Sequence, residues 1–233
     1  MPSAGALEET LVNSSCLGSF ESFTGCSFSL FLTFLRLQDI ILQQPGSAMS
    51  RREFHTLIRD LRGRLMNWKS PIAAWSRQDP DWYHLQDAYR WSFLLYSFRA
   101  LDWFHPPDSS TIKQAVQETL DSVSLLLPTA DLARRTVFPL FMAGTDALAP
   151  HQQEYISQRL KAVRNITGFR NLAVSRILER VWTDRRARNA DEQGDITWFD
   201  IVGFPVSPWV IHPETNVVQV ASSRTNDYDY FIM

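Results

Sequence analysis

The sequence predicts an all-α fold, an irregular array of about seven helices around a kinked central helix, followed by a less regular acidic C-terminal tail. Three observations predict it. Apolar residues recur at helical spacing in successive segments between residues 28 and 188. Helix caps and prolines mark the ends of these segments. No segment before residue 195 has the alternating pattern of a β-strand.

The chain of 233 residues divides by composition into three parts. Residues 1–27 are rich in Ser, Gly and Thr, and we expect a poorly ordered leader there. Residues 28–188 form the predicted helical domain, and residues 189–233 form an acidic aromatic tail. Apolar residues are 45% and charged residues 21% of the chain. These are ordinary values for a globular protein and argue against wholesale disorder.

Two amphipathic helices are expected to open the domain. The first ends at Pro45-Gly46 and has one apolar stripe: Leu30, Phe34, Leu37 and Ile41. The second starts at Ser50, which forms a capping box with Glu53 three residues on. From Arg51 to Lys69 it carries six cationic and two acidic side chains beside its apolar stripe. It is either a basic recognition helix or an amphipathic helix with a solvated charged face, including Arg62; we favour the solvated face.

Prolines bound the next two helices. Asp79-Pro80 is an N-cap followed by Pro at the first helical position. The helix that follows, to about Phe104, is apolar nearly all round, which predicts burial by several neighbours. Asp108 can cap a further helix that Pro128 closes and that has a single apolar stripe: Ile112, Val116, Leu120, Val123 and Leu127.

The stretch Asp131–Leu148 is predicted to be the buried centre of the domain, because it is too apolar for a solvent-facing segment. Pro139 removes a backbone donor inside a helical run and frees the carbonyl of Arg135, which predicts a kink. The small residues around Gly144 would let another helix cross closely. Pro and Gly inside one helix cost about 4 kcal/mol of intrinsic propensity, so tertiary packing has to offset them.

Two more helices complete the domain. Pro150 starts the first, and Gly168 is its expected C-terminal stop. Asn171 is expected to cap the second, which ends in a basic run: Arg180, Arg185, Arg186 and Arg188. This run either stabilises the helix C-terminus, with Asp184 one turn away, or belongs to a nuclear-import signal. We favour the first interpretation.

The sequence shows no motif for catalysis or metal binding. Cys16 and Cys26 are too few for a metal site or a disulfide framework, and we expect free thiols. The five His have no metal-ligand spacing, and phosphate-binding and nucleophile-elbow motifs are absent. The long aromatic helix offers only Asp87 and Asp102, fifteen residues apart, to hold the Mg²⁺ of an isoprenoid cyclase. We therefore expect no enzyme, and no catalytic, cofactor-binding or metal-ligating residues.

Membrane and nucleic-acid partners are not expected either. The apolar run from Phe28 to Leu42 is interrupted by Arg36 and Asp39, and no Lys or Arg precedes it, so it fits neither a signal peptide nor a spanning helix. A net charge of -2 gives no global attraction to nucleic acid or anionic lipid. These features indicate an intracellular protein.

Between Asp87 and about Val202 the chain has an ordered series of motifs: AYRWSFLLYSFRAL, TLDSVSLLLP, FPLFMAGTDA, QRLKAV, GFRNL, ILERVWTDRR and DITWFDIV. In this order they resemble the C-terminal regulatory domain of fungal-specific binuclear zinc-cluster transcription factors. The small-residue block and the later Leu-Glu-x-x-Trp turn are the most specific. The resemblance covers about half of the chain.

The resemblance implies an all-helical regulatory domain that acts in the nucleus, or between nucleus and cytoplasm, through protein partners of the transcription machinery or a related factor. The family's zinc cluster needs six cysteines, and nothing here matches it, so no direct nucleic-acid binding is expected. A truncated paralogue and a short gene model both remain open, as does an unknown small-molecule effector. The alternative function is a helical small-molecule-binding protein or enzyme with an aromatic pocket.

The tail, residues 189–233, carries a net charge of -6 and leaves +4 on the rest of the chain. Its last seven residues, DYDYFIM, alternate acid with aromatic and finish apolar. Such alternation is typical of disordered activation segments. The alternative, which we favour slightly, is an acidic tail folded back on the basic side of the body, with Val217–Val220 as a short strand.

Overall fold

The computed structural model describes residues 17–42, 50–70, 80–101, 109–127, 131–168, 170–188 and 196–202. Within these residues every regular element is a helix, so the predicted all-α class is confirmed. The elements are α2 (Leu17–Thr24), α3 (Phe28–Leu42), α4 (Arg51–Asn67), α5 (Asp81–Leu101), α6 (Ser110–Ser124), the 3-10 helix η2 (Ala133–Thr136), α7 (Val137–Asp146), α8 (Pro150–Thr167), α9 (Leu172–Ala187) and α10 (Trp198–Val202).

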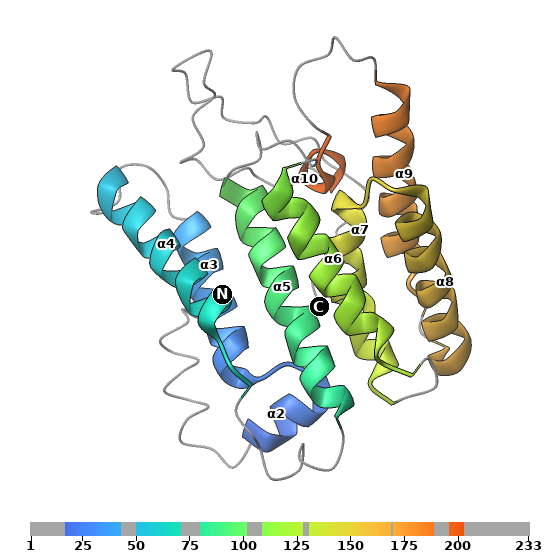
Figure 1. The fold of residues 1–233 in the computed structure, drawn as a ribbon, viewed down its shortest axis with the longest axis horizontal. Helices are drawn as coiled ribbons and strands as arrows, with labels where there is room; N and C mark the ends of the chain where they lie inside the picture. The colour runs from blue at the N-terminus through green and yellow to red at the C-terminus, as the bar shows by residue number, and fades with distance from the viewer. Residues whose placement is uncertain are drawn as a thin grey trace.

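The longer helices lie side by side, with α3 and α4 at one edge and α8 and α9 at the other (Figure 1). Helix α5 packs against α3, α4, α6 and α7. Helix α7 packs against α5, α6, α8 and α9. The two helices that were predicted to be most buried therefore join the two edges of the array.

Several predicted helix ends are confirmed. The backbone N–H of Glu53 donates to the hydroxyl of Ser50 at 3.3 Å, and the N–H of Ser50 donates to the Glu53 carboxylate at 2.7 Å, which completes the capping box of α4. Helix α8 begins at Pro150, and Gly168 ends it with φ 68°. A left-handed residue there favours glycine, because a side chain would meet the backbone.

Two predicted caps are corrected. The N-cap of α6 is Ser109, which accepts from the N–H of Ile112 at 3.4 Å, and Asp108 lies outside the described residues. Asn171 precedes α9, but its side chain makes no capping bond. The Asn171 amide donates instead to the carbonyl of Leu160 at 3.0 Å, because this buried side chain faces α8 across the turn.

Where a kink was predicted at the centre, the 3-10 helix η2 passes directly into α7. Pro139 is the third residue of α7, where its missing N–H removes no intrahelical hydrogen bond. The carbonyl of Arg135, which Pro139 cannot bond, accepts the hydroxyl of Tyr89 at 2.9 Å. As predicted, the Arg135 carbonyl has no helical donor at Pro139, and the hydroxyl of Tyr89 on α5 donates to it instead.

The aromatic side chains of α5 pack against one another and against their neighbours. The ring of Phe34 stacks on Phe93 with centroids 4.2 Å apart, and the ring of Tyr89 lies parallel to that of Phe138 at 6.0 Å. The ring of Tyr96 meets Phe34 edge-on at 5.1 Å. These contacts place the aromatic side chains inside one hydrophobic core.

Helices α2 and α10 lie in the segments predicted as a poorly ordered leader and a less regular tail. Sequence reasoning missed α2, which is held by the body: the carbonyl of Phe23 accepts Arg135 Nε at 2.9 Å, and that of Thr24 accepts the Tyr89 hydroxyl at 3.2 Å. The proposed strand at Val217–Val220 and the acidic-aromatic end lie outside the described residues. The three-part division of the chain stays a prediction.

We expect Tyr89 to make stability fall at alkaline pH. Burial raises the pKa of Tyr89 well above its ordinary value, the Cys26 thiol adds to this, and Arg135 opposes it. The unfolded phenol ionises near pH 10, so its deprotonation favours the unfolded chain from about that pH upward. Tyr89→Phe, which loses the one O–H donor shared by the carbonyls of Thr24 and Arg135, should be about 1 kcal/mol less stable than wild type at pH 7.

Urea unfolding at pH 7 and at about pH 11 measures the effect. The stability gap between wild type and Tyr89→Phe should narrow at the higher pH, because only the wild type loses the contribution of a protonated Tyr89. A gap of constant size across this range would contradict the expected ionisation.

Candidate functional site: a buried arginine–aspartate cluster beneath α10

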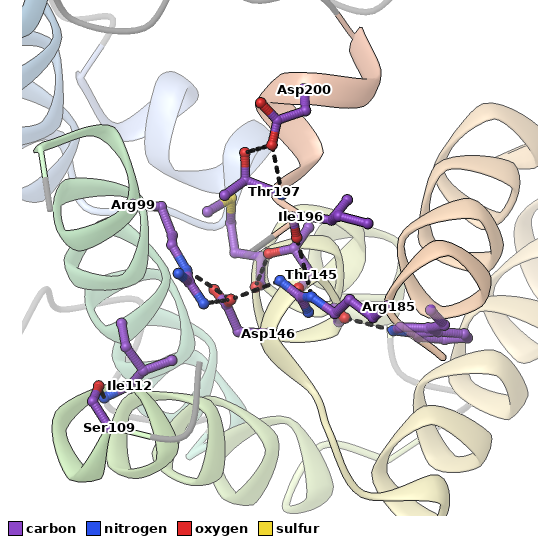
Figure 2. Close-up of polar contacts among 12 residues, drawn as sticks. Arg99, Ser109, Ile112, Thr145, Asp146, Arg185, Ile196, Thr197 and Asp200 are labelled. Carbon is purple, nitrogen blue, oxygen red and sulfur yellow. Dashed lines mark hydrogen bonds and ion pairs between the residues drawn. The ribbon is translucent and has the colours of Figure 1, made fainter. Parts of the chain in front are cut away.

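Three charged side chains are buried together where α5, α7 and α9 meet (Figure 2). Arg99 comes from α5, Asp146 is the last residue of α7, and Arg185 lies in the last turn of α9; their side chains are 1%, 1% and 11% exposed. Arg99 Nε donates to Asp146 Oδ1 at 2.7 Å, and Arg99 Nη2 contacts the same oxygen. Arg185 Nη2 lies 3.5 Å from it. We call these three residues the Arg–Asp cluster.

The C-terminal end of α7 explains why α9 supplies an arginine here. The last carbonyls of a helix have no intrahelical donor. Trp182 Nε1 donates to the carbonyl of Gly144 at 2.8 Å, and Arg185 Nη1 donates to the carbonyl of Thr145. A cation at this end is also favoured by the helix dipole, whereas the carboxylate of Asp146 is not. The two arginines compensate for that unfavourable position.

The Arg–Asp cluster brings two positive side chains against one negative side chain. Two guanidinium groups face one carboxylate, and both contacts use Asp146 Oδ1. Asp146 Oδ2 is buried and has no hydrogen-bond partner among the described residues. Because ions taken out of water lose their hydration, such a cluster is sensitive to removal of any one member. It can fix the relative positions of three helices.

Arg185 also holds the segment that leads into α10. Its Nε donates to the carbonyl of Ile196 at 3.0 Å. The next residue, Thr197, donates from both its backbone N–H and its hydroxyl to Asp200 Oδ2, each at 2.8 Å. Figure 2 shows Thr197 and Asp200 facing each other above the cluster. Asp200 thereby orders the first turn of α10, and Arg185 links that turn to the end of α7.

The aromatic pair of α10 packs onto the body beside the cluster. Trp198 and Phe199 stack on each other with ring centroids 4.1 Å apart. Trp198 meets Phe141 of α7 edge-on at 5.4 Å, and Phe199, only 5% exposed, lies 6.0 Å from Tyr96 of α5. Helix α10 also packs against α9. The aromatic side chains of α10 thus contact α5 and α7, and the helix itself packs against α9.

The basic run of α9 divides into buried and exposed side chains. Arg185 belongs to the cluster, whereas the side chain of Arg180 is 67% exposed and pairs with Asp184 at 2.6 Å. Arg186 is exposed as well. A structural role for the run is confirmed at Arg185, although the helix end that it stabilises is that of α7 rather than its own. The nuclear-import interpretation stays a prediction.

The basic helix α4 is largely a solvated face, as we favoured, with one correction. Arg62 does not point into solvent: its Nε donates to the Ser97 hydroxyl at 3.1 Å and its Nη2 to the Ser97 carbonyl at 2.7 Å. Its guanidinium lies 4.6 Å from the centroid of the Phe98 ring. The long side chain crosses from its own helix to α5, which sequence periodicity does not reveal. Exposed cations remain on α4: Arg52, Arg59 and Arg64.

Metal and membrane sites are not found in the described part of the chain. No group of three His, Cys, Asp or Glu side chains there is placed to hold a metal ion. None of its helices has both the length and the apolar character needed to span a membrane. Cys26 is a buried free thiol whose pKa burial raises well above its ordinary value, while Cys16 lies outside the described residues. Asp87 pairs with Arg90 at 2.9 Å, and Asp102 lies outside them too.

Sequence reasoning named no site residue, and it missed Arg99 and Asp146. Both stand out only as charged residues within the apolar motifs AYRWSFLLYSFRAL and FPLFMAGTDA. A charge in such a segment predicts a buried pair, because Arg and Asp are almost never fully buried unless paired. The spacing of 47 residues between them gives no indication that they meet.

A protein-family model described as "Fungal specific transcription factor domain" matches residues 6–209. The matched range includes every described helix and the Arg–Asp cluster. No zinc-cluster domain is detected. Neither the curated proteins nor the solved structures that were compared match this chain. The resemblance seen in the motifs from Asp87 to Val202 is therefore confirmed, and the match extends it toward the N-terminus.

Proposed function

The chain belongs to the family of fungal-specific transcription factor domains, and we propose that it regulates transcription in the nucleus through protein partners, without binding DNA itself. Domains of this family are regulatory and generally non-enzymatic. The proposed partners are proteins of the transcription machinery or a related factor. The proposal rests on family membership together with the way in which the structure uses its arginines.

Three arginines of the body are engaged inside the protein, whereas others on α4 and α9 are exposed. Arg62 bonds α4 to α5, and Arg185 bonds α9 to α7 and α10. Arg159 donates from Nη2 to the carbonyls of Val123 and Leu126, each at 3.0 Å, and so caps the end of α6. Phosphate recognition needs cations that reach out from the surface. The structural use of Arg62, Arg159 and Arg185 therefore leaves fewer cations for such contacts.

The aromatic-pocket alternative has less support. The rings of α3, α5 and α7 pack against one another, which favours a packed aromatic core over a ligand pocket lined by these rings. An effector that binds elsewhere stays a prediction from the sequence.

Fluorescence anisotropy of the purified chain with labelled duplex DNA pools tests the proposal. At physiological salt we expect only sequence-independent binding, with a Kd of about 10⁻⁴–10⁻⁶ M that weakens steeply as salt rises. Selection of one duplex sequence with nanomolar affinity at that salt concentration would overturn it.

A tethering assay tests the positive half of the proposal. The full chain, fused to an unrelated DNA-binding domain, should change expression of a reporter that carries the matching site. The DNA-binding domain alone, expressed at the same level, is the control. Equal reporter expression from the two proteins would count against partner-mediated regulation.

A further inference from the structure

Two motifs of the series, QRLKAV and GFRNL, meet at the turn that joins α8 to α9. Between Glu154 and Glu179 the chain has five cations and no acid. Arg159 is buried against the end of α6, whereas the other four cations are exposed: Lys161, Arg164, Arg170 and Arg176. The described residues form no ion pair with any of these four side chains. The turn therefore carries positive charge that the described part of the body does not pair.

The four exposed cations lie near one another because the turn brings two helix ends together. Lys161 lies six residues before the end of α8, and Arg176 lies four residues after the start of α9. At 1.5 Å per residue, each is within about 10 Å of the turn along its helix axis. The Asn171 amide donates to the carbonyl of Leu160 at 3.0 Å and so fixes the turn against α8. The turn lies at the edge of the array, at the opposite end of α9 from the Arg–Asp cluster (Figure 1).

Helix dipoles account for only one of these cations. Arg164 lies in the last turn of α8, where a cation is favoured. Arg170 lies just before α9, where the dipole favours an anion instead, and the first turn of α9 contains no acid. Lys161 and Arg176 lie more than one turn from the nearest helix end, beyond the reach of this effect. The charge of the turn thus contributes little to the stability of its own helices.

Two aliphatic side chains are exposed among the cations. Ile166, in the last turn of α8, is 46% exposed, and Leu172, the first residue of α9, is 43% exposed. Leu172 and Arg176 are four residues apart and therefore share one face of α9. Burial of aliphatic surface is favourable, whereas phosphate groups offer it no apolar contact. We call this surface the basic turn, and its residues are Lys161, Arg164, Ile166, Arg170, Leu172 and Arg176.

We propose that the basic turn binds an acidic segment of a partner protein in which carboxylate side chains are interspersed with aliphatic or aromatic ones. Complementary charge selects such a segment and speeds its association, and burial of the aliphatic side chains then slows its release. The whole chain has a net charge of -2, so a long polyanion is repelled by the rest of the molecule, whereas a short segment meets only the turn. A role for this partner in transcription rests on the proposed function, but the binding does not.

Fluorescence anisotropy of the full chain with a short labelled synthetic peptide tests the proposal. In this peptide Asp and Glu alternate with Leu and Phe. Arg170→Glu with Arg176→Glu turns two attractions into repulsions and should weaken binding at least about tenfold. Ile166→Ser with Leu172→Ser removes apolar contact and should weaken it about fivefold.

The matched control is Arg52→Glu with Arg59→Glu on α4. Both arginines are exposed, and the double variant changes the net charge by the same amount, so it should bind the peptide as wild type does. Two further peptides, one with Asn and Gln in place of the acids and one with Ala in place of Leu and Phe, should each bind wild type several-fold more weakly. Thermal unfolding followed by circular dichroism establishes that each variant is folded. If the serine variant is not, the two glutamate variants carry the test, since they change only exposed side chains.

Absence of peptide binding to wild type up to about 1 mM would overturn the proposal, as would equal losses in the α4 and basic-turn variants or equal affinity for all three peptides. Duplex DNA or anionic vesicles might bind more tightly than the peptide and lose this binding in Arg170→Glu with Arg176→Glu; the surface would then recognise phosphates. Tighter peptide binding after Tyr228, Tyr230 and Phe231 are changed to Ala would assign the basic turn to the chain's own acidic tail. A tethered chain that leaves reporter expression unchanged would count against the proposed function and leave the peptide result standing.

Discussion

Replacing Asp146 by Asn is expected to lower the free energy of unfolding by about 3–5 kcal/mol, which is the cost of leaving buried charge without its counterion. Asn has nearly the size of Asp and keeps an oxygen acceptor, so the loss reports the missing negative charge. The side chain of Arg99 is only 1% exposed and cannot regain its hydration in water without opening the helices around it. Thermal unfolding followed by circular dichroism should show a fall in Tm on the order of 10 °C.

Asp184→Asn is the matched control for this effect. Asp184 also pairs with an arginine, at 2.6 Å, but the side chain of Arg180 is 67% exposed. Exposed helix pairs contribute about 0.3–0.5 kcal/mol, so this variant should be nearly as stable as wild type. If Asp146→Asn and Asp184→Asn lowered the free energy of unfolding by similar amounts, burial of the Arg–Asp cluster would not explain the loss in Asp146→Asn.

A double variant separates the charge effect from packing. Arg99→Met with Asp146→Leu removes two of the three buried charges and keeps apolar volume in their place. Replacing a buried ion pair in this way is often neutral or stabilising, so the double variant should recover most of the stability that Asp146→Asn loses. Arg185 retains its bonds to the carbonyls of Thr145 and Ile196 in that variant. A double variant no more stable than Asp146→Asn would contradict the explanation by unpaired charge.

The helical array could be predicted from the sequence because its evidence is local. The capping box of Ser50 and Glu53 lies within one turn, and Pro150 and Gly168 mark the two ends of α8 by their own backbone preferences. Helix α2 could not be found in this way. It is held by Arg135, 112 residues away in sequence from the carbonyl that it binds. Local pattern carries no information about such a contact.

The candidate site was beyond sequence reasoning for the same physical reason. Arg185 was recognised as a cation near a helix end, but the helix end that it serves lies 40 residues earlier in the chain. Arg99 and Asp146 were visible as charges in apolar segments, and only the packing of α5 against α7 brings them together. Periodicity assigns a residue to one face of a helix. It does not assign the partner that covers that face.

Gly144→Leu is the second large expected effect, a loss of about 1–3 kcal/mol from overpacking. A Cβ at Gly144 would lie 2.8 Å and 2.9 Å from the two methyl carbons of Leu178 on α9, and 3.5 Å from Ile156 on α8. The close crossing predicted around this glycine is therefore present, between α7 and α9. Leu has a helix propensity nearly 1 kcal/mol better than Gly, so the measured loss is what remains after that gain.

Gly63 in α4 provides the matched comparison, because a Cβ there would meet nothing within 4 Å. Gly63→Ala should raise the free energy of unfolding by up to about 1 kcal/mol, since Ala is the better helix former and no neighbour has to move. Gly144→Ala carries the same propensity gain but presses on Leu178, so it should gain less or lose stability. Equal gains at Gly63 and Gly144 would contradict the close crossing.

A double-mutant cycle then identifies the neighbour that is compressed at Gly144. Leu178→Ala alone should cost about 2–5 kcal/mol because it leaves a cavity in the core. Combined with Gly144→Leu, the new side chain can enter that cavity, so the two losses should sum to more than the loss of the double variant. Strictly additive losses in urea unfolding would mean that the added side chain does not reach the space vacated at position 178. In that case the crossing between α7 and α9 would not be the cause of the effect at Gly144.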